Sequence, residues 1–173
     1  MGDDAPVKFA YADPPYYGCG RLYAHLHDQA RVWDDKQSHL DLVSRLLEEY
    51  QDGWALSCNP RDLSWLLPAC PDTARVCAWV KNYHAMRPNV SVQYAWECVI
   101  VVGGRKIKGR KPMIRDWITG PATRQTGTPG AKPDYFNRWV LELLGYQDGD
   151  TLDDLFPGSG GMGWTTAQGV MFA

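Results

Sequence analysis

The chain has 173 residues, of which 45% are hydrophobic, and its formal net charge at pH 7 is only −2. This length predicts one domain over residues 1–173 that buries its own core. The small net charge excludes a polycationic protein, so nucleic-acid binding would need a local basic patch. No apolar run is long enough to cross a bilayer, and the N-terminus does not resemble a signal peptide. We therefore expect a cytoplasmic protein that does not bind membranes.

The cysteines and histidines point to a reducing compartment and no metal site. The cysteines are odd in number and no two form a CxxC pair, which favours free thiols. The four histidines show no ligand spacing with them, so we predict no bound metal. The cysteines are Cys19, Cys58, Cys70, Cys77 and Cys98.

Four elements are predicted in the first part of the chain from apolar runs and helical spacing. They are a strand over Val7–Ala12, a helix over Ser38–Tyr50 with Ser38 as its N-cap, a strand over Trp54–Cys58, and a short helix from Asn59 or Pro60 to Leu67. The stretch from Tyr17 to about Gln37 is polar and has no clear period.

The second part of the chain continues the alternation of strands and helices. We predict strands over Ala74–Val80 and Trp96–Val102, a helix from Pro133 or Asp134 to Leu144 that Gly145 ends, and a last strand over Thr151–Phe156. The alternation favours an α/β domain with a mostly parallel sheet and helices on its faces. Residues 105–130 lack a clear period, and we interpret them as a long functional loop rather than a second domain.

A tetrapeptide that combines a carboxylate, two prolines and an aromatic ring follows the first strand: Asp13, Pro14, Pro15 and Tyr16. Ligands of such sheets bind beyond the carboxyl ends of the strands. The Asp13 carboxylate and the Pro14 carbonyl can accept hydrogen bonds from an exocyclic amine, and the prolines restrict the backbone that carries this carbonyl. Tyr16 can stack on a base that has left its helix. Taken alone, the motif also suits a simple proline turn at the end of a strand.

A glycine-rich turn follows the last strand, in the order Asp154, Phe156, Gly158, Ser159 and Gly160. Glycine lets the backbone pass close to a ligand, and the amides that follow can hold a carboxylate. The spacing differs from the dinucleotide fingerprint, and it lacks the lysine of a phosphate-binding loop. The turn therefore predicts a cofactor site, although a lone Gly-x-Gly is a weak signal.

Together these motifs resemble those of the amino-methyltransferases of DNA, a family with a Rossmann-like fold. Its members carry a catalytic (Asp/Asn/Ser)-Pro-Pro-(Tyr/Phe/Trp) motif and a Phe-x-Gly-x-Gly turn, and a Lys-Pro that precedes a helix matches Lys132 and Pro133. The catalytic motif comes first here, which is the circularly permuted order of the β class. The resemblance covers most of the chain. It implies S-adenosylmethionine as cofactor, with Lys132 and Pro133 beside its methionine part.

The resemblance also implies the reaction, which is methylation of an exocyclic amine, most simply N6 of adenine in DNA. Two alternatives stay open within enzymes, namely RNA adenine and a protein amide. A third alternative is a non-catalytic subunit that binds nucleic acid or a partner.

The chain departs from the family after the glycine turn. Relatives continue with two more strands, one of which supplies an acidic residue for the cofactor ribose, so we expect a sheet shortened at one edge. Asp28, Asp150 and Asp153 are possible substitutes for that residue. A bare sheet edge can pair with another chain, so we expect a homodimer or a partner subunit that completes the cofactor site.

The main basic cluster of the chain lies at the start of the 105–130 segment. Such side chains contact a phosphate backbone without reading sequence, although most charged runs are simply solvated. We predict nucleic-acid contacts for these residues, and for two that follow the catalytic motif. The predicted contacts are Arg105, Lys106, Lys108, Arg110 and Lys111 in the cluster, and Tyr17 and Arg21 after the motif.

Overall fold

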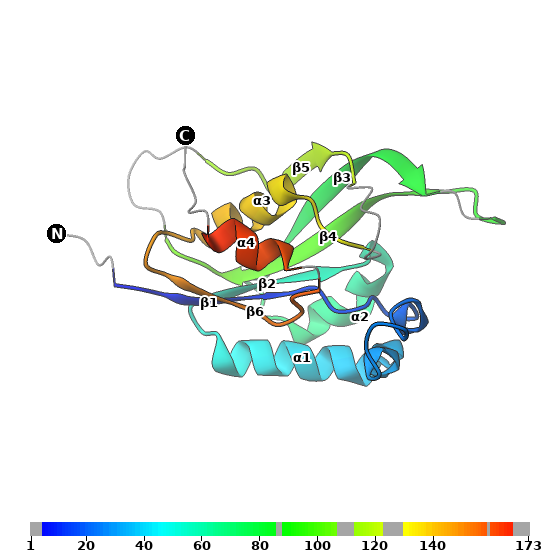
Figure 1. The fold of residues 1–173 in the computed structure, drawn as a ribbon, viewed down its shortest axis with the longest axis horizontal. Helices are drawn as coiled ribbons and strands as arrows, with labels where there is room; N and C mark the ends of the chain where they lie inside the picture. The colour runs from blue at the N-terminus through cyan, green and yellow to red at the C-terminus, as the bar shows by residue number, and fades with distance from the viewer. Residues whose placement is uncertain (1–4, 86–87, 107–112, 123–129, 159, 168–173) are drawn as a thin grey trace.

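The computed structural model describes residues 5–85, 88–106, 113–122, 130–158 and 160–167. These residues form one six-stranded sheet with helices on both faces (Figure 1). The strands are β1 (Lys8–Ala12), β2 (Gly53–Cys58), β3 (Arg75–Ala85), β4 (Tyr94–Gly103), β5 (Trp117–Gly120) and β6 (Thr151–Asp154). The α-helices are α1 (Lys36–Glu49), α2 (Leu63–Leu66), α3 (Asp134–Leu144) and α4 (Gly161–Ala167).

The strand order is β5-β3-β4-β2-β1-β6. The pairs β1–β2, β1–β6 and β3–β5 are parallel, whereas β4 is antiparallel to both β2 and β3. Five strands therefore run in one direction and β4 runs against them, which agrees with the prediction of a mostly parallel sheet. The reversal has a consequence for the site, because the first residues of β4 lie beside the carboxyl ends of its neighbours.

Alternation along β1 divides the core into two layers. Phe9 and Tyr11 face α3 and α4, whereas Ala10 and Ala12 face α1 and α2. Small alanine side chains on the second face let the apolar stripe of α1 pack closely against the strands. Figure 1 shows α3 and α4 on one side of the sheet and α1 and α2 on the other.

The predicted elements are present, with differences at their ends. Asp35 rather than Ser38 caps α1, since its carboxylate accepts a hydrogen bond from the Gln37 amide at 3.2 Å. The short helix after β2 is divided into a 3-10 turn, α2 and a second 3-10 turn over 60–69. As predicted, Gly145 ends α3, in the left-handed conformation at φ +68°.

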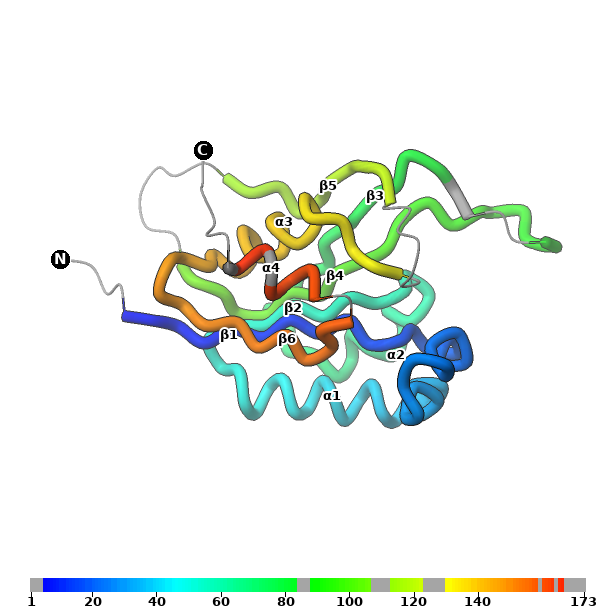
Figure 2. The backbone as a smooth tube through the Cα atoms, in the orientation of Figure 1, coloured from blue at the N-terminus to red at the C-terminus, as the bar shows by residue number. Residues whose placement is uncertain are grey.

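Two elements escaped the prediction, namely β5 and α4. The prediction that residues 105–130 form only a loop was wrong, because β5 lies within this segment and pairs with the edge of β3. Its four residues are too few to show a period of two, and the pairing comes from the tertiary fold. The path of the backbone through both elements is visible in Figure 2.

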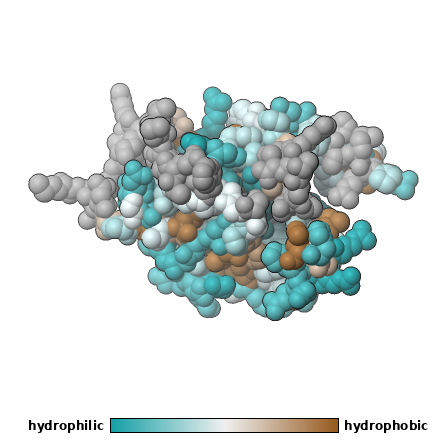
Figure 3. Space-filling view, in the orientation of Figure 1, coloured by the Kyte–Doolittle hydropathy of each residue, from teal (hydrophilic) through white to brown (hydrophobic). Residues whose placement is uncertain are grey.

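Strand β6 borders the sheet on one side and pairs only with β1 among the described strands. Figure 3 shows apolar residues between α1 and this edge on the face turned toward the viewer. Among the described strands, β6 therefore forms one edge of the sheet and leads directly into the glycine-rich turn. In the described ranges, no helix is long and apolar enough to span a membrane.

A buried ion pair ties the start of the 105–130 segment to the entry of β6. An Arg105 guanidinium nitrogen lies 2.5 Å from Oδ1 of Asp150, whose side chain is 1% exposed. The same carboxylate accepts hydrogen bonds from the Val7 and Gln147 amides, each at 2.8 Å. Arg105 thus has a structural role, and its guanidinium does not extend toward solvent as the nucleic-acid prediction required.

Replacing Arg105 with methionine leaves the Asp150 charge buried without its partner. We expect the Arg105→Met variant to lose about 3 kcal/mol in the free energy of unfolding, measured by urea denaturation. Lys106→Met, at the adjacent exposed position, is the matched control and should change stability by less than about 0.5 kcal/mol. Equal stability of the two variants would show that Asp150 does not depend on Arg105.

Candidate active site

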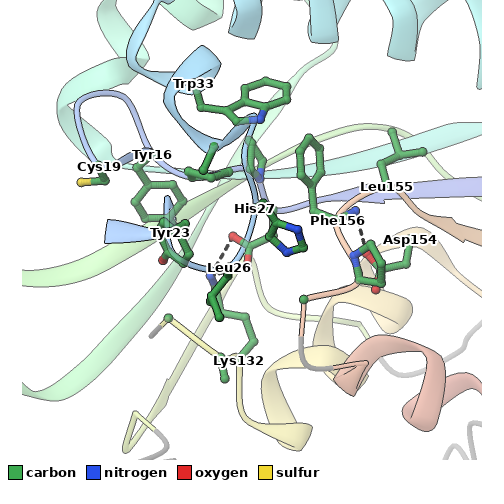
Figure 4. A pocket seen from close by; sticks show the side chains of 18 of the residues that line it. Tyr16, Cys19, Tyr23, Leu26, His27, Trp33, Lys132, Asp154, Leu155 and Phe156 are labelled. Atoms are coloured by element: carbon green, nitrogen blue, oxygen red, sulfur yellow. Dashed lines mark hydrogen bonds and ion pairs between the residues drawn. The ribbon is translucent and has the colours of Figure 1, made fainter. Parts of the chain in front are cut away.

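A cavity of about 940 Å³ opens at the carboxyl ends of β1 and β6. Both sequence motifs line it, the Asp13 turn after β1 and the glycine turn after β6. Figure 4 shows Tyr16, Tyr23 and Lys132 on one side of this cavity and Phe156 and Asp154 on the other. Because β1 and β6 are parallel neighbours, two motifs more than 140 positions apart meet at one edge of the sheet.

Asp13 is paired with Lys132, which precedes α3. The Lys132 ammonium lies 2.7 Å from each carboxylate oxygen of Asp13, and the lysine side chain is 9% exposed. Burial raises the pKa of Asp13, and the adjacent Lys132 charge opposes this rise. Burial lowers the pKa of Lys132, but the charges of Asp13 and Glu97 more than offset it, so the lysine pKa lies above its ordinary value. The pair thus keeps two opposite charges together at the wall of the cavity, where the lysine side chain is largely buried.

Glu97 extends this pair into a network of two carboxylates and two lysines. Its Oε2 accepts a hydrogen bond from the Tyr16 hydroxyl at 2.7 Å and lies 3.7 Å from the Lys132 ammonium. Lys81 donates to its other oxygen. Burial raises the pKa of Glu97, but Lys132 and Lys81 outweigh that effect and bring the pKa below its ordinary value. Glu97 thereby fixes the orientation of the Tyr16 ring.

Glu97 and Lys81 were not predicted as site residues from the sequence. Glu97 lies near the start of β4, and the reversal of this strand brings it to the carboxyl ends of β1 and β2. Lys81 lies one residue beyond the predicted end of β3. The sequence does hold a signal for Glu97, which is a carboxylate inside an otherwise apolar strand. Such a group needs a charged partner when the strand is buried.

The glycine turn is positioned by aromatic packing. The Phe156 ring meets Trp33 edge-on at a centroid distance of 4.9 Å, and Asp154 accepts a hydrogen bond from the Phe156 amide at 3.2 Å. Gly158 has φ +46°, a conformation that favours glycine. Gly158 lines the cavity, Gly160 lies beside it in the turn, and the predicted Ser159 is outside the described residues. Trp33 was not predicted.

A segment over 20–34 borders the cavity between the two motifs. The Gly20 amide donates to Asp34 at 2.7 Å and closes the segment at its base. Its middle crosses the cavity, where Figure 4 places His27 between Leu26 and the glycine turn. Asp28 follows His27 and also lines the cavity.

The three acidic residues that were predicted as candidates for binding the cofactor ribose lie in different environments. Asp150 is buried against Arg105, and Asp153 pairs with Lys8 at 2.8 Å and accepts the Tyr50 hydroxyl at 2.7 Å. Neither residue lines the cavity, whereas Asp28 does.

The predicted nucleic-acid contacts are distributed over several places. Tyr17 packs edge-on against Trp65 at 5.8 Å and does not line the cavity, so Tyr23 is the tyrosine that follows the motif and faces it. Arg21 and Lys106 are exposed. The remaining predicted contacts, Lys108, Arg110 and Lys111, lie outside the described residues.

This arrangement presents a buried carboxylate, an adjacent backbone carbonyl and a fixed aromatic ring at one end of a cavity. A carboxylate has about four acceptor positions, so Asp13 can accept a further hydrogen bond while it contacts Lys132. The other end offers a glycine turn and apolar aromatic surface. The cavity is large enough for a cofactor and a base together.

No family model and no curated protein matches the chain. Two crystal structures are among the solved structures that share its fold. The crystal structure of the M1.HpyAVI–SAM complex has a TM-score of 0.60 and 18% sequence identity, and covers 94% of this chain and 78% of that one. The crystal structure of M1.HpyAVI has a TM-score of 0.54 and 16% sequence identity, and its alignment covers 94% of this chain and 76% of that one. These alignments confirm the predicted α/β fold, which the chain shares with both structures.

Replacing Lys132 with methionine tests the charge network directly. The variant leaves Asp13 buried beside Glu97 without its cation, so we expect a loss of about 3 kcal/mol in unfolding free energy at pH 7. The Asp13 pKa then rises further above 3.8. An acid whose folded-state pKa is raised favours folding at low pH, and this contribution is lost as pH rises through the new pKa.

The stability deficit of Lys132→Met should therefore be small at pH 4 and large at pH 8 in urea denaturation. Adding Asp13→Asn removes the unpaired charge and should restore most of the stability at pH 8. A deficit that is the same at both pH values would contradict the buried pair.

Proposed function

We propose that the chain is an S-adenosylmethionine-dependent methyltransferase that acts on the exocyclic amine of a nucleic-acid base, N6 of adenine in DNA. The observation that carries this proposal is the position of the Asp13 carboxylate in the same cavity as the glycine turn. One end suits an amine and the other suits a cofactor, within the fold of a methyltransferase.

The residues around Asp13 suit an amine substrate. An exocyclic amine on an aromatic base is a poor nucleophile, because its lone pair is delocalised into the ring. Hydrogen bonds from both of its N–H groups to the Asp13 carboxylate and the Pro14 carbonyl favour the pyramidal nitrogen, whose lone pair is free to attack. Tyr16, held by Glu97, stacks on the base.

S-adenosylmethionine fits the other end of the cavity, and it supplies an electrophilic methyl group when bound. Phe156, Gly158 and Gly160 would hold it with the backbone of Lys132 and Pro133, and Asp154 supports the turn through the Phe156 amide. Support comes from the fold neighbour that was crystallised as a SAM complex. Ser159, in the same turn, belongs to this proposed cofactor site.

Exposed cations at two places would contact nucleic acid, because Arg21 lies in the segment that borders the cavity, whereas Lys106 follows β4 at the amino ends of the parallel strands, where Gly103 pairs with Gly53. Arg21 follows the catalytic motif in the chain, and Lys106 begins the segment that continues with Lys108, Arg110 and Lys111. Contacts of this kind go to phosphates and give salt-dependent binding without sequence readout.

The proposal is tested by incubating the chain with S-adenosylmethionine and unmethylated DNA, with RNA in parallel, followed by nucleoside mass spectrometry. We expect N6-methyladenine in DNA, reduced by about 10²-fold or more in Asp13→Ala. Asp72→Asn, at an exposed position outside the cavity, is the control and should keep full activity. N4-methylcytosine or methylated RNA would correct the substrate, and no methylated base in either polymer would refute the proposal.

Asp28 is the residue that we propose for the cofactor ribose, because it is the acidic candidate that lines the cavity. Hydrogen bonds to a charged group contribute about 1.5–3 kcal/mol. Asp28→Asn should therefore weaken S-adenosylmethionine binding at least tenfold in calorimetry. Asp153→Asn changes the same group outside the cavity and should leave the affinity within about twofold. An unchanged affinity in Asp28→Asn would reject this assignment.

A further inference from the structure

Asn137 differs from the other buried polar residues in having no partner. It lies in α3 and is 3% exposed, yet its side chain makes no hydrogen bond to another residue in the described ranges. The other five each have at least one polar partner. They are His39, Ser57, Asp62, Asp150 and Thr165.

The polar atoms of this side chain are not sealed from solvent, since in the described ranges the fully buried side-chain atom without a hydrogen-bond partner is Nε of Arg105. Water can therefore hydrogen-bond to the Asn137 amide when no ligand is present, and a ligand that replaces this water must offer matching donors and acceptors. Asn137 does line the cavity, which gives its amide access to that ligand.

The position of Asn137 indicates which part of the cofactor it meets. The backbone N–H of Asn137 donates to the Pro133 carbonyl, so the residue lies one turn into α3, just after Lys132. Lys132 contacts Asp13 at 2.7 Å, and the transferred methyl group must lie close to the Asp13 carboxylate. The sulfonium therefore lies near the start of α3.

Two substituents extend from the sulfonium, the amino-acid end and the adenosine. The aromatic and apolar surface of Phe156, Trp33 and Leu155 suits the flat adenosine, and these residues line the part of the cavity at the glycine turn. The amino-acid end is then directed toward α3. It carries an ammonium and a carboxylate, and an asparagine amide has both the acceptor and the donors that match them.

We propose that the Asn137 amide binds the amino-acid end of S-adenosylmethionine and so sets the direction in which the cofactor lies. This inference rests on the proposed function. It makes Asn137 a cofactor-binding residue on α3 that neither the motifs nor the glycine turn identify.

The test compares two ligands that differ in the amino-acid chain and in the positive charge that this third substituent gives the sulfur. S-adenosylmethionine has the amino-acid group, whereas 5′-methylthioadenosine lacks it and keeps the adenosine. We expect Asn137→Leu to weaken S-adenosylmethionine binding by about tenfold in calorimetry and to leave 5′-methylthioadenosine binding unchanged.

Controls separate this inference from its premise. Glu142→Leu lies on the same helix outside the cavity and should leave both affinities unchanged. Asn137→Ala should show the same selective loss if the leucine variant folds poorly. If the Asn137 variants lose affinity equally for both ligands, or lose none, the assignment of Asn137 is wrong. Binding of S-adenosylmethionine to the wild-type protein would still support the proposed cofactor. A wild-type protein that binds neither ligand overturns the proposed function and this inference with it.

Discussion

The ion pair between Asp13 and Lys132 holds the site together, because it joins residues 119 positions apart and places them beside Glu97. Two carboxylates and two lysines balance one another in this cluster, so no buried charge lacks a counterion. The pairing fixes the start of α3 against the end of β1. The position of Tyr16 and the floor of the cavity follow from that attachment, since Glu97 orients the tyrosine ring.

A second constraint acts at the other end of the cavity. The segment over 20–34 is closed at its base by Gly20 and Asp34 and attached to the glycine turn where Trp33 meets Phe156. A loop fixed at both ends loses little further freedom when a ligand binds beneath it. The cavity is thus bounded by a charged cluster on one side and an aromatic contact on the other, with a partly preorganised border between them.

Much of this arrangement follows from the sequence. The apolar runs predicted β1, β2 and β4, and each motif was predicted to follow a strand; the parallel pairing of β1 with β6 then brings Asp13 and Phe156 to one edge. Glu97 was out of reach, because its place depends on the reversal of β4, which is a tertiary choice. The Asp35 cap was missed for a local reason, since the helix begins at Lys36, four residues before Leu40, its first apolar residue. Asn137 was readable in principle, as an amide on the buried stripe of a helix.

The edge position of β6 has a thermodynamic consequence. This four-residue strand has one neighbour in the described sheet and leads directly into the glycine turn. Edge strands open locally at lower free energy than central ones, and a ligand that binds only the closed form stabilises it by mass action. Ligand binding at the turn and closure of β6 are therefore linked. The factor by which closure raises the ligand affinity equals the factor by which the ligand raises the equilibrium constant for closure. A polypeptide that pairs along β6 would act as a remote enhancer of affinity at the turn, without touching what is bound there.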